Sequence, residues 1–387
     1  MNRAAAIQAA FTPHHADALN SFLRQARRAL TSDPSSVHVV MGNEACDADS
    51  MVSSLVHAFR HPPVTDGAFV LPVMSVNRDQ FALRCEVSAL FRAAHIDIEA
   101  LVFQDEIDLL NTPCLRLVLT DHNKLKKDYL NLGELVVEII DHHADLGAHG
   151  HVTGAARDIA FERNDSGGHA LVGSACTLVA ERISALQPLE ATLLLGVITL
   201  DTMNMDAKAK KGTARDDAVL KRLEALSLVP RDDLYSWLVA EKFSPDNWAT
   251  FTFNNCLQYD YKQFESSGIV YGCSAILVPL LTFWTKANHD PISLLEAHRV
   301  RLQLQFVLVQ SMVQSTAGPK RQLLLYAPDV RLRDALNRFL NDAPLQLTPL
   351  DLSSLSVVAF DQANITMSRK QLVPLLDAFL ATYVAKM

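Results

Sequence analysis

The fold is decided by the stretch VHVVMGNEACDADS, residues 37–50. Its first part, residues 37–41, is a short apolar run, and the turn that follows carries Asn43, Asp47 and Asp49. Short apolar runs of this kind are typical of strands that are buried in a parallel sheet. Ligands of open parallel sheets bind beyond the carboxyl ends of the strands. The stretch therefore predicts a strand that delivers two carboxylates to a ligand site.

Similar runs recur along the first part of the chain and alternate with segments that have helical spacing. This alternation is typical of α/β domains and predicts a mostly parallel sheet flanked by helices. The further strand candidates are residues 70–76, 115–120 and 135–140, and the helix candidates are residues 50–59, 81–94, 175–186 and 191–200.

The length of 387 residues predicts two domains. The composition changes after the charged stretch 206–217 and the helix candidate behind it, so we place the boundary between a domain 1–228 and a domain 229–387. We expect the active site in the cleft between them. The second domain is predicted to be a smaller α/β unit with strands at 268–278 and 322–327 and helices at 292–312 and 368–383.

The charge balance is acidic, with 43 Asp and Glu against 35 Lys and Arg and a net charge of −8. This balance argues against a protein that coats nucleic acid. The six cysteines form no C-x-x-C pair, so we expect neither a disulfide framework nor a zinc ribbon. A reducing compartment, the cytoplasm, is therefore expected.

One stretch, residues 266–285, contains no charge over a length that could span a bilayer. Gly268, Gly272 and Pro279 interrupt it, so we favour a strand and a turn and expect no membrane association. The N-terminal residues lack the apolar core of a signal peptide, and a short transit peptide stays an alternative.

Acidic residues also follow the later strand candidates. Asp121 follows residues 115–120, the triplet Asp141-His142-His143 follows residues 135–140, and Asp201 ends an apolar helix candidate. A single aspartate at such a place is usually a helix cap or a turn former. Four crowded carboxylates, Asp47, Asp49, Asp121 and Asp201, would repel one another unless cations neutralise them. Their charge matches two divalent cations, as in hydrolases that activate one water between two metals.

These motifs, in this order, resemble the four motifs of the DHH phosphoesterase superfamily. The opening Gly42-Asn43-Glu44, with Asn where the superfamily more often has His, is similar to the eukaryotic exopolyphosphatase and prune branch. The element Gly173-Ser174-x-x-Thr177 is similar to one in that branch and in the family II inorganic pyrophosphatases. Ser368-Arg369-Lys370 and Asp260-Tyr261-Lys262 resemble two phosphate-binding segments of their C-terminal domain.

The resemblance implies a role for each matching position. Asn43 and Asp47 would contact one metal, Asp49, His142 and Asp201 the other, and Asp121 would bridge them. His143 would face the phosphate, so that His143, Asp121 and His142 form the catalytic group, with Asp141 orienting its neighbours. Lys262, Arg369 and Lys370 would bind substrate phosphates from the second domain.

The metal preference follows from Asn43, which puts a neutral oxygen where the superfamily has an imidazole. Hard oxygen ligands suit Mg²⁺, so we predict two divalent cations with Mg²⁺ preferred and Mn²⁺ or Co²⁺ as substitutes. The predicted function is an exopolyphosphatase, active as a monomer on inorganic polyphosphate. An acidic polyphosphate-storing vesicle is the alternative location.

Three other functions stay open. An inorganic pyrophosphatase would share nearly every motif except Asn43. A nucleotide phosphodiesterase or short-oligonucleotide exonuclease would use the same metals, although the Ser-Arg-Lys segment argues against it. A prune-like interaction protein with weak hydrolase activity is the third. Vertebrate prune proteins have Asp-His-Arg as the triplet, whereas His143 keeps the hydrolase form.

Further polar clusters have competing readings. His142, His143, His149 and His151 are a weak zinc candidate, because no cysteine or helical spacing supports it. His149 or His151 could instead reach the substrate, and His122 is either near the metals or structural. The basic run Lys208, Lys210, Lys211 and Arg215 is a solvated face or a rim that guides phosphates.

Overall fold

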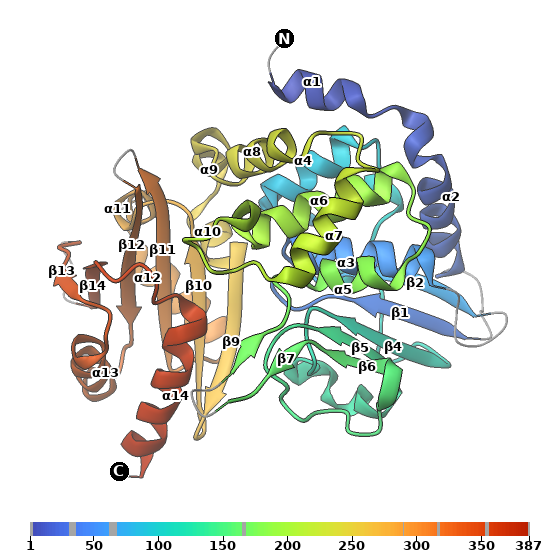
Figure 1. Ribbon diagram of the computed structural model, residues 1–387. Helices are drawn as coiled ribbons and strands as arrows, with labels where there is room; N and C mark the ends of the chain where they lie inside the picture. The colour runs from blue at the N-terminus through green and yellow to red at the C-terminus, as the bar shows by residue number, and fades with distance from the viewer. Residues whose placement is uncertain are drawn as a thin grey trace. The chain divides into compact units, whose positions relative to one another are not determined.

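The computed structural model describes residues 3–30, 36–61, 68–164, 168–288, 290–315, 318–352 and 356–385. The chain divides into two compact units, Met1–Lys242 and Phe243–Met387 (Figure 1). We call them the first and the second unit.

The division lies later than the boundary predicted at 228/229. Helix α8 (Arg231–Lys242) belongs to the first unit because it packs on α4 (Cys85–Ala93) and α6 (Pro188–Asp201). Its Leu234, Trp237 and Leu238 are buried there.

The first unit contains a six-stranded sheet in the order β3-β2-β1-β4-β5-β6, in which all pairs are parallel. The predicted parallel sheet is thus confirmed. The chain runs outward from β1 to β3, returns beside β1 with β4, and continues to the other edge, so the topological switch point lies between β1 and β4. Such a point is where open α/β sheets bind ligands. The strands are β1 (Val37–Met41), β2 (Phe69–Met74), β3 (Val102–Phe103), β4 (Leu115–Thr120), β5 (Val136–Asp141) and β6 (Arg157–Ile159).

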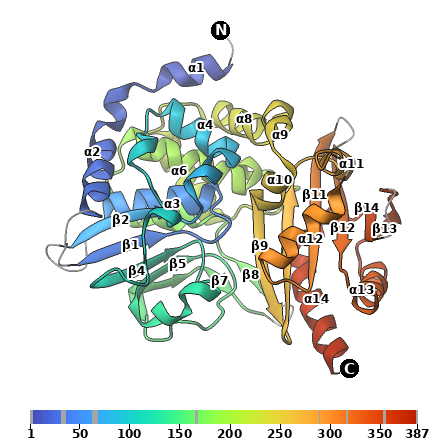
Figure 2. The same ribbon diagram turned by 180° about the vertical axis from the view of Figure 1, so that it is seen from behind.

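Helices cover one face of this sheet, where α3 packs on β1, β2 and β4 and also contacts α5 and α6 (Figures 1 and 2). Helix α6 is apolar on nearly every side and is buried over residues 189–199, as its sequence predicts. Irregular segments and 3₁₀ turns supply Leu109, Leu125, Leu132 and Val152 to the core on the other face. The other helices are α1 (Arg3–Ala10), α2 (Pro13–Ala29), α3 (Ala48–Arg60), α5 (Ala175–Arg182) and α7 (Ala214–Glu224).

Shorter elements complete the first unit. The helix predicted over residues 81–94 is divided into a 3₁₀ turn and α4, with Arg84 between them. A small antiparallel pair joins β7 (Phe161–Glu162) and β8 (His169–Ala170). The 3₁₀ turns are η1 (Arg78–Leu83), η2 (Ile98–Ala100), η3 (Gln104–Glu106), η4 (Lys127–Leu135), η5 (Gly154–Ala156) and η6 (Met203–Met205).

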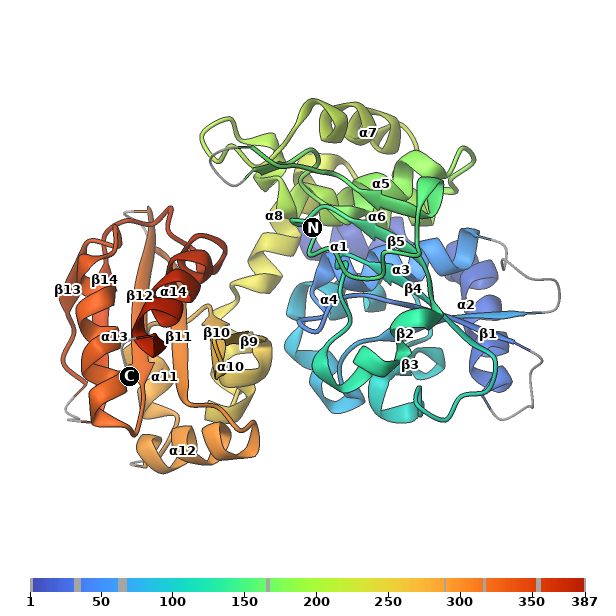
Figure 3. The same ribbon diagram turned by 90° about the horizontal axis from the view of Figure 1, so that it is seen from below.

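The second unit has a mixed sheet in the order β13-β14-β12-β11-β10-β9, where β10 and β11 alone pair in parallel. Helices α13 and α14 share one core cluster with the sheet, while α10 contacts both α11 and α12 (Figure 3). Its strands are β9 (Asp260–Ser266), β10 (Ile269–Ile276), β11 (Phe306–Ser315), β12 (Gly318–Tyr326), β13 (Leu347–Pro349) and β14 (Val357–Gln362). Its helices are α9 (Pro245–Thr250), α10 (Phe253–Tyr259), α11 (Leu280–Thr285), α12 (Pro291–Arg301), α13 (Val330–Asp342) and α14 (Arg369–Val384).

The helix predicted over residues 292–312 is wrong in its second half. Helix α12 ends at Arg301, Gln303 takes a left-handed conformation with φ +56°, and β11 begins at Phe306. The uncharged stretch 266–285 forms mainly β10 and α11. Among the described helices, none combines the length and the apolar character needed to cross a membrane.

Candidate active site

The turn after β1 is packed tightly against the start of α3. A Cβ on Gly42 would lie 2.4 Å from Ser50 Cβ, so only glycine fits there. Asp47 is the N-cap of α3, and its Oδ1 accepts a hydrogen bond of 3.1 Å from the Ser50 amide. Asp49 is the second residue of α3 and is buried. The turn and helix therefore hold both predicted carboxylates next to the switch point.

Asp49 lies at the N-terminus of α5, the helix that begins with the Gly173-Ser174 element. Its carboxylate accepts hydrogen bonds from Ser174 Oγ at 2.7 Å, from the Ala175 amide at 2.7 Å and from the Cys176 amide at 2.8 Å. Helix N-termini stabilise negative charge. Asp49 is thus held in one orientation.

Asp121, directly after β4, is buried and adopts a left-handed conformation with φ +61°. Its Oδ2 accepts hydrogen bonds from Asn43 Nδ2 at 2.6 Å and from Ser50 Oγ at 2.7 Å. Two residues of the β1 turn and α3 therefore fix the carboxylate that follows β4.

The triplet after β5 places two imidazoles against these carboxylates. His142 Nε2 lies 3.4 Å from Asp121 Oδ1 and 3.6 Å from Asp49 Oδ2. His142 Nδ1 lies 3.1 Å from the Val172 carbonyl, which can only accept, so Nδ1 carries the hydrogen and Nε2 faces the carboxylates. Asp121, His142 and His143 each offer a ligand atom within 4.8 Å of the others.

His143 is oriented by the first residue of its own triplet. Its Nδ1 lies 2.9 Å from Asp141 Oδ1 and 3.6 Å from Asp121 Oδ1. Asp141 is fully buried, and its other oxygen accepts a hydrogen bond of 2.6 Å from Asn123 Nδ2. Burial alone would raise the pKa of Asp141, but the hydrogen bond and charge of His143 and the charge of His142 hold it below its usual value.

The electrostatics of the cluster are strained without cations. Burial and the charges of Asp49 and Asp47 raise the pKa of Asp121 to about 7. The same causes raise the pKa of Asp201 well above its usual value. The Oδ2 atom of Asp201 is buried and has no hydrogen-bond partner among the described residues. Carboxylates and an imidazole with these properties fit divalent cations, which would remove the repulsion.

Asn43 makes other contacts than those expected of a metal ligand. Its Oδ1 accepts hydrogen bonds from the amides of Ala45 at 2.8 Å and Cys46 at 3.2 Å, while its Nδ2 donates to Asp121. The side chain closes its own turn and supports Asp121, and its place as a metal ligand stays a prediction.

Several supporting residues were missed by sequence reasoning. Ser50 donates a hydrogen bond to Asp121, and Asn123 donates one to Asp141. In both pairs the two residues lie far apart in the sequence. Buried Arg84 donates to the carbonyls of Ala45 (3.1 Å) and Cys46 (3.3 Å), and so holds the β1 turn from the start of α4. Only Ser174 had a sequence signal, the Gly-Ser-x-x-Thr element.

The predicted phosphate-binding residues belong to the second unit. Lys262 lies on β9, opposite Cys273 of β10, and Arg369 and Lys370 begin α14. Arg369 Nη2 forms an ion pair of 2.7 Å with Asp260 Oδ1. The structure thus brings the two predicted segments, Asp260–Lys262 and Ser368–Lys370, into contact.

Other predicted candidates have structural contacts. His149 and His151 bind the backbone carbonyls of Gly133 and Val136, and His122 lies 2.9 Å from the Thr120 carbonyl. In the described part of the chain, His149 and His151 join no group of metal-binding side chains. Arg215 of the basic run pairs with Glu181.

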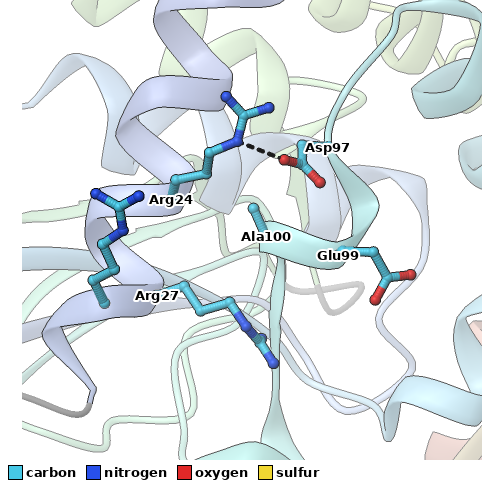
Figure 4. A pocket seen from close by; sticks show the side chains of 6 residues that line it. Arg24, Arg27, Asp97, Glu99 and Ala100 are labelled. Atoms are coloured by element: carbon cyan, nitrogen blue, oxygen red, sulfur yellow. Dashed lines mark hydrogen bonds and ion pairs between the residues drawn. The ribbon is translucent and has the colours of Figure 1, made fainter.

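A surface hollow lined by Arg24, Arg27, Arg28, Asp97, Glu99 and Ala100 contains none of the predicted site residues (Figure 4). Arg24 pairs with Asp97 at 2.7 Å and Arg27 with Glu106 at 3.0 Å. These ion pairs tie α2 to the segments directly before and after β3.

The first unit gathers carboxylates and imidazoles at the switch point of a parallel sheet, and a unit with a mixed sheet follows it, an arrangement that fits a phosphoester-type hydrolase. The model of the DHH family N-terminal domain matches residues 38–203, and that of the DHHA2 domain matches residues 244–379. The chain belongs to the DHH phosphoesterase superfamily and is similar to its exopolyphosphatase and prune branch.

Two relatives agree with this assignment, and a solved structure shares the fold. The chain is 33% identical over 379 residues to the Homo sapiens protein "Exopolyphosphatase PRUNE1", covering 94% of this chain and 80% of that protein. It is 30% identical over 380 residues to a "Putative exopolyphosphatase" of Schizosaccharomyces pombe, covering 90% and 92%. The crystal structure of a Methanococcus jannaschii putative family II inorganic pyrophosphatase has the same fold, with a TM-score of 0.59 at 19% identity, covering 88% of this chain and 99% of that one.

Proposed function

We propose that this protein is an exopolyphosphatase, which hydrolyses the terminal phosphoanhydride bond of inorganic polyphosphate. Water adds to the terminal phosphorus, the bond to the bridging oxygen breaks, and orthophosphate leaves a chain that is one phosphate shorter. The observation that carries the proposal is the gathering of Asp49, Asp121 and Asp201 with His142 and His143 at the switch point. The names of the relatives in human and fission yeast support the substrate class.

The residues that would hold the cations are those of the carboxylate cluster. Asp47 is proposed for one site, Asp49, His142 and Asp201 for the other, and Asp121 for both. Asn43 is proposed for the first site from its sequence position. It would support that site by its hydrogen bond to Asp121, or would bind the cation directly after its side chain rotates. Two divalent cations, Mg²⁺ by preference and Mn²⁺ or Co²⁺ as substitutes, would supply Lewis acidity and lower the pKa of the attacking water.

The chain's own residues would do the rest. His143, whose Nδ1 is held by Asp141, would direct its other nitrogen at a phosphate oxygen and stabilise charge or donate a proton there. In the second unit, Lys262, Arg369 and Lys370 would bind phosphates of the chain, since Arg and Lys recognise phosphate by charge-assisted hydrogen bonds. Asp260 would orient Arg369 for this role.

A matched pair of variants tests the proposal. Asp201→Asn removes a carboxylate whose Oδ2 is buried in the cluster, whereas Asp206→Asn changes an exposed carboxylate five residues further on. With Mg²⁺ and long-chain polyphosphate, phosphate release by Asp201→Asn should fall by about 100-fold or more, while Asp206→Asn keeps the wild-type rate. Wild-type release by Asp201→Asn would contradict the assignment of the site.

A further inference from the structure

Asp216, on the first turn of α7, is a buried carboxylate outside the cluster and is 0% exposed. It accepts hydrogen bonds from four donor groups. They are the Gly173 amide (2.8 Å to Oδ2), Thr177 Oγ1 (2.6 Å), the Thr213 amide (2.8 Å) and Thr213 Oγ1 (2.8 Å). Burying a carboxylate is costly unless such donors compensate it.

Part of this arrangement is an ordinary capping box. Thr213 is the N-cap of α7 and Asp216 is its N3 residue, and the two exchange hydrogen bonds. A capping box needs only the contacts with Thr213. The two contacts with Gly173 and Thr177 reach a different helix, 43 and 39 residues away in the sequence. They link the start of α7 to the start of α5.

The segment that Asp216 holds is the one that binds Asp49. In residues 173–177, the two ends donate to Asp216, and the three middle residues donate to Asp49. A Cβ on Gly173 would lie 2.7 Å from Thr202 Cγ2, which places this segment against the residue after Asp201. The N-terminus of α5 therefore contacts Asp216, the candidate metal ligand Asp49, and Thr202, the residue after a second candidate ligand.

We propose that Asp216 is a positioning residue for the metal centre, acting through the N-terminus of α5 on Asp49. The inference rests on the proposed metal site but not on polyphosphate as the substrate. Metal ligands must be held within about 0.5 Å of their working geometry. Residues that orient ligands through hydrogen bonds typically change metal affinity by about 10- to 100-fold when they are replaced.

Adjacent residues give a matched test. Asp216→Asn keeps the shape of the side chain but sets an NH₂ group against one of the donors. Asp217→Asn changes a partly exposed residue that pairs with Lys221. Calorimetric titration of each chelator-treated protein with Mn²⁺ should show affinity lowered about 10- to 100-fold in Asp216→Asn and unchanged in Asp217→Asn. Wild-type affinity in Asp216→Asn would overturn the inference.

A milder pair keeps the test decisive if Asp216→Asn fails to fold. Thr177→Val removes one donor to Asp216 without touching Asp49, and Thr177→Ser restores the hydroxyl. Mn²⁺ affinity should fall by about 10-fold in Thr177→Val and recover in Thr177→Ser. Equal affinity in the two variants would overturn the inference.

The same titration separates this inference from the proposed substrate. A wild-type protein that binds Mn²⁺ but leaves polyphosphate intact would contradict the exopolyphosphatase alone. Polyphosphate hydrolysis with Mn²⁺ binding that is insensitive to Asp216→Asn and Thr177→Val would contradict the positioning role alone.

Discussion

Replacing Asp121 by asparagine should stabilise the metal-free protein at alkaline pH and remove its response to metal ions. Asp121 is buried, and the charges of Asp49 and Asp47 raise its pKa to about 7. The shape of the side chain is kept, because an asparagine Oδ1 can accept the hydrogen bonds from Asn43 and Ser50. Asparagine also tolerates the left-handed backbone at this position.

The magnitude follows from the difference between the folded and unfolded pKa. Because the folded pKa is raised, the charge of Asp121 lowers the free energy of unfolding only above the unfolded pKa of 3.8. The loss grows as the pH rises and is complete above about 7. At about 1.4 kcal/mol per pKa unit, the cost is about 2 kcal/mol near pH 5 and about 4 kcal/mol near pH 8. Asp121→Asn, which cannot ionise, should avoid it.

Urea unfolding with EDTA, near pH 5 and near pH 8, measures this difference in the free energy of unfolding. The advantage of Asp121→Asn over the wild type should grow by about 2 kcal/mol between the two pH values. Asp128→Asn, at an exposed residue of η4, is the matched control and should show no such change. With Mn²⁺, the order should reverse, because a ligand of the folded state stabilises only the protein that binds it.

The reasoning would be refuted by a pH-independent difference, or by an Asp121→Asn protein that is less stable than the wild type in EDTA near pH 8. Equal stabilisation of both proteins by Mn²⁺ would refute the assignment of Asp121 to the metal centre.

Three further changes have expected outcomes. His143→Gln should lower kcat for polyphosphate by about 100-fold and leave Mn²⁺ binding detectable by calorimetry, and an unchanged kcat would rule out contact with the reacting phosphate. Lys370→Ala should chiefly raise KM, with a smaller effect at high salt, where charges are screened; an unaltered KM would contradict its phosphate-binding role. Burial and the charge of Arg301 lower the pKa of His298 to about 4. Protonation of His298 should therefore lower the free energy of unfolding of the second unit by about 3 kcal/mol as the pH falls from about 6.5 to 4. In urea unfolding, the stability of His298→Phe should fall less with acid than that of the wild type. An identical pH dependence in the two proteins would contradict this role of His298.

The parallel sheet and the order of the candidate site residues were predictable because their signals are local. Each apolar run forms a strand whose last residues reach the same edge of the sheet, so the residues after β1, β4 and β5 had to approach one another. The helical pattern of α6 likewise predicted a buried helix that ends at Asp201.

The failures concern features that depend on distant partners. An amphipathic helix such as α8 does not reveal from its sequence which of two cores it joins, and the structure assigns it to the first unit. Residues 306–309 of β11 are all buried, so their sequence does not alternate between apolar and polar residues as that of a half-exposed strand does. The prediction therefore joined this run to the preceding helix. The contacts of Ser50 with Asp121 and of Asp216 with Gly173 span 71 and 43 residues and leave no trace in the local sequence.

Phosphate release with Mg²⁺, compared side by side for tripolyphosphate, long-chain polyphosphate, pyrophosphate and a cyclic nucleotide, tests the central claim most directly. The proposed function predicts fast release from the two polyphosphates, with pyrophosphate left over. Preferred cleavage of pyrophosphate or of the cyclic nucleotide, or no turnover by a protein that binds Mn²⁺, would contradict it.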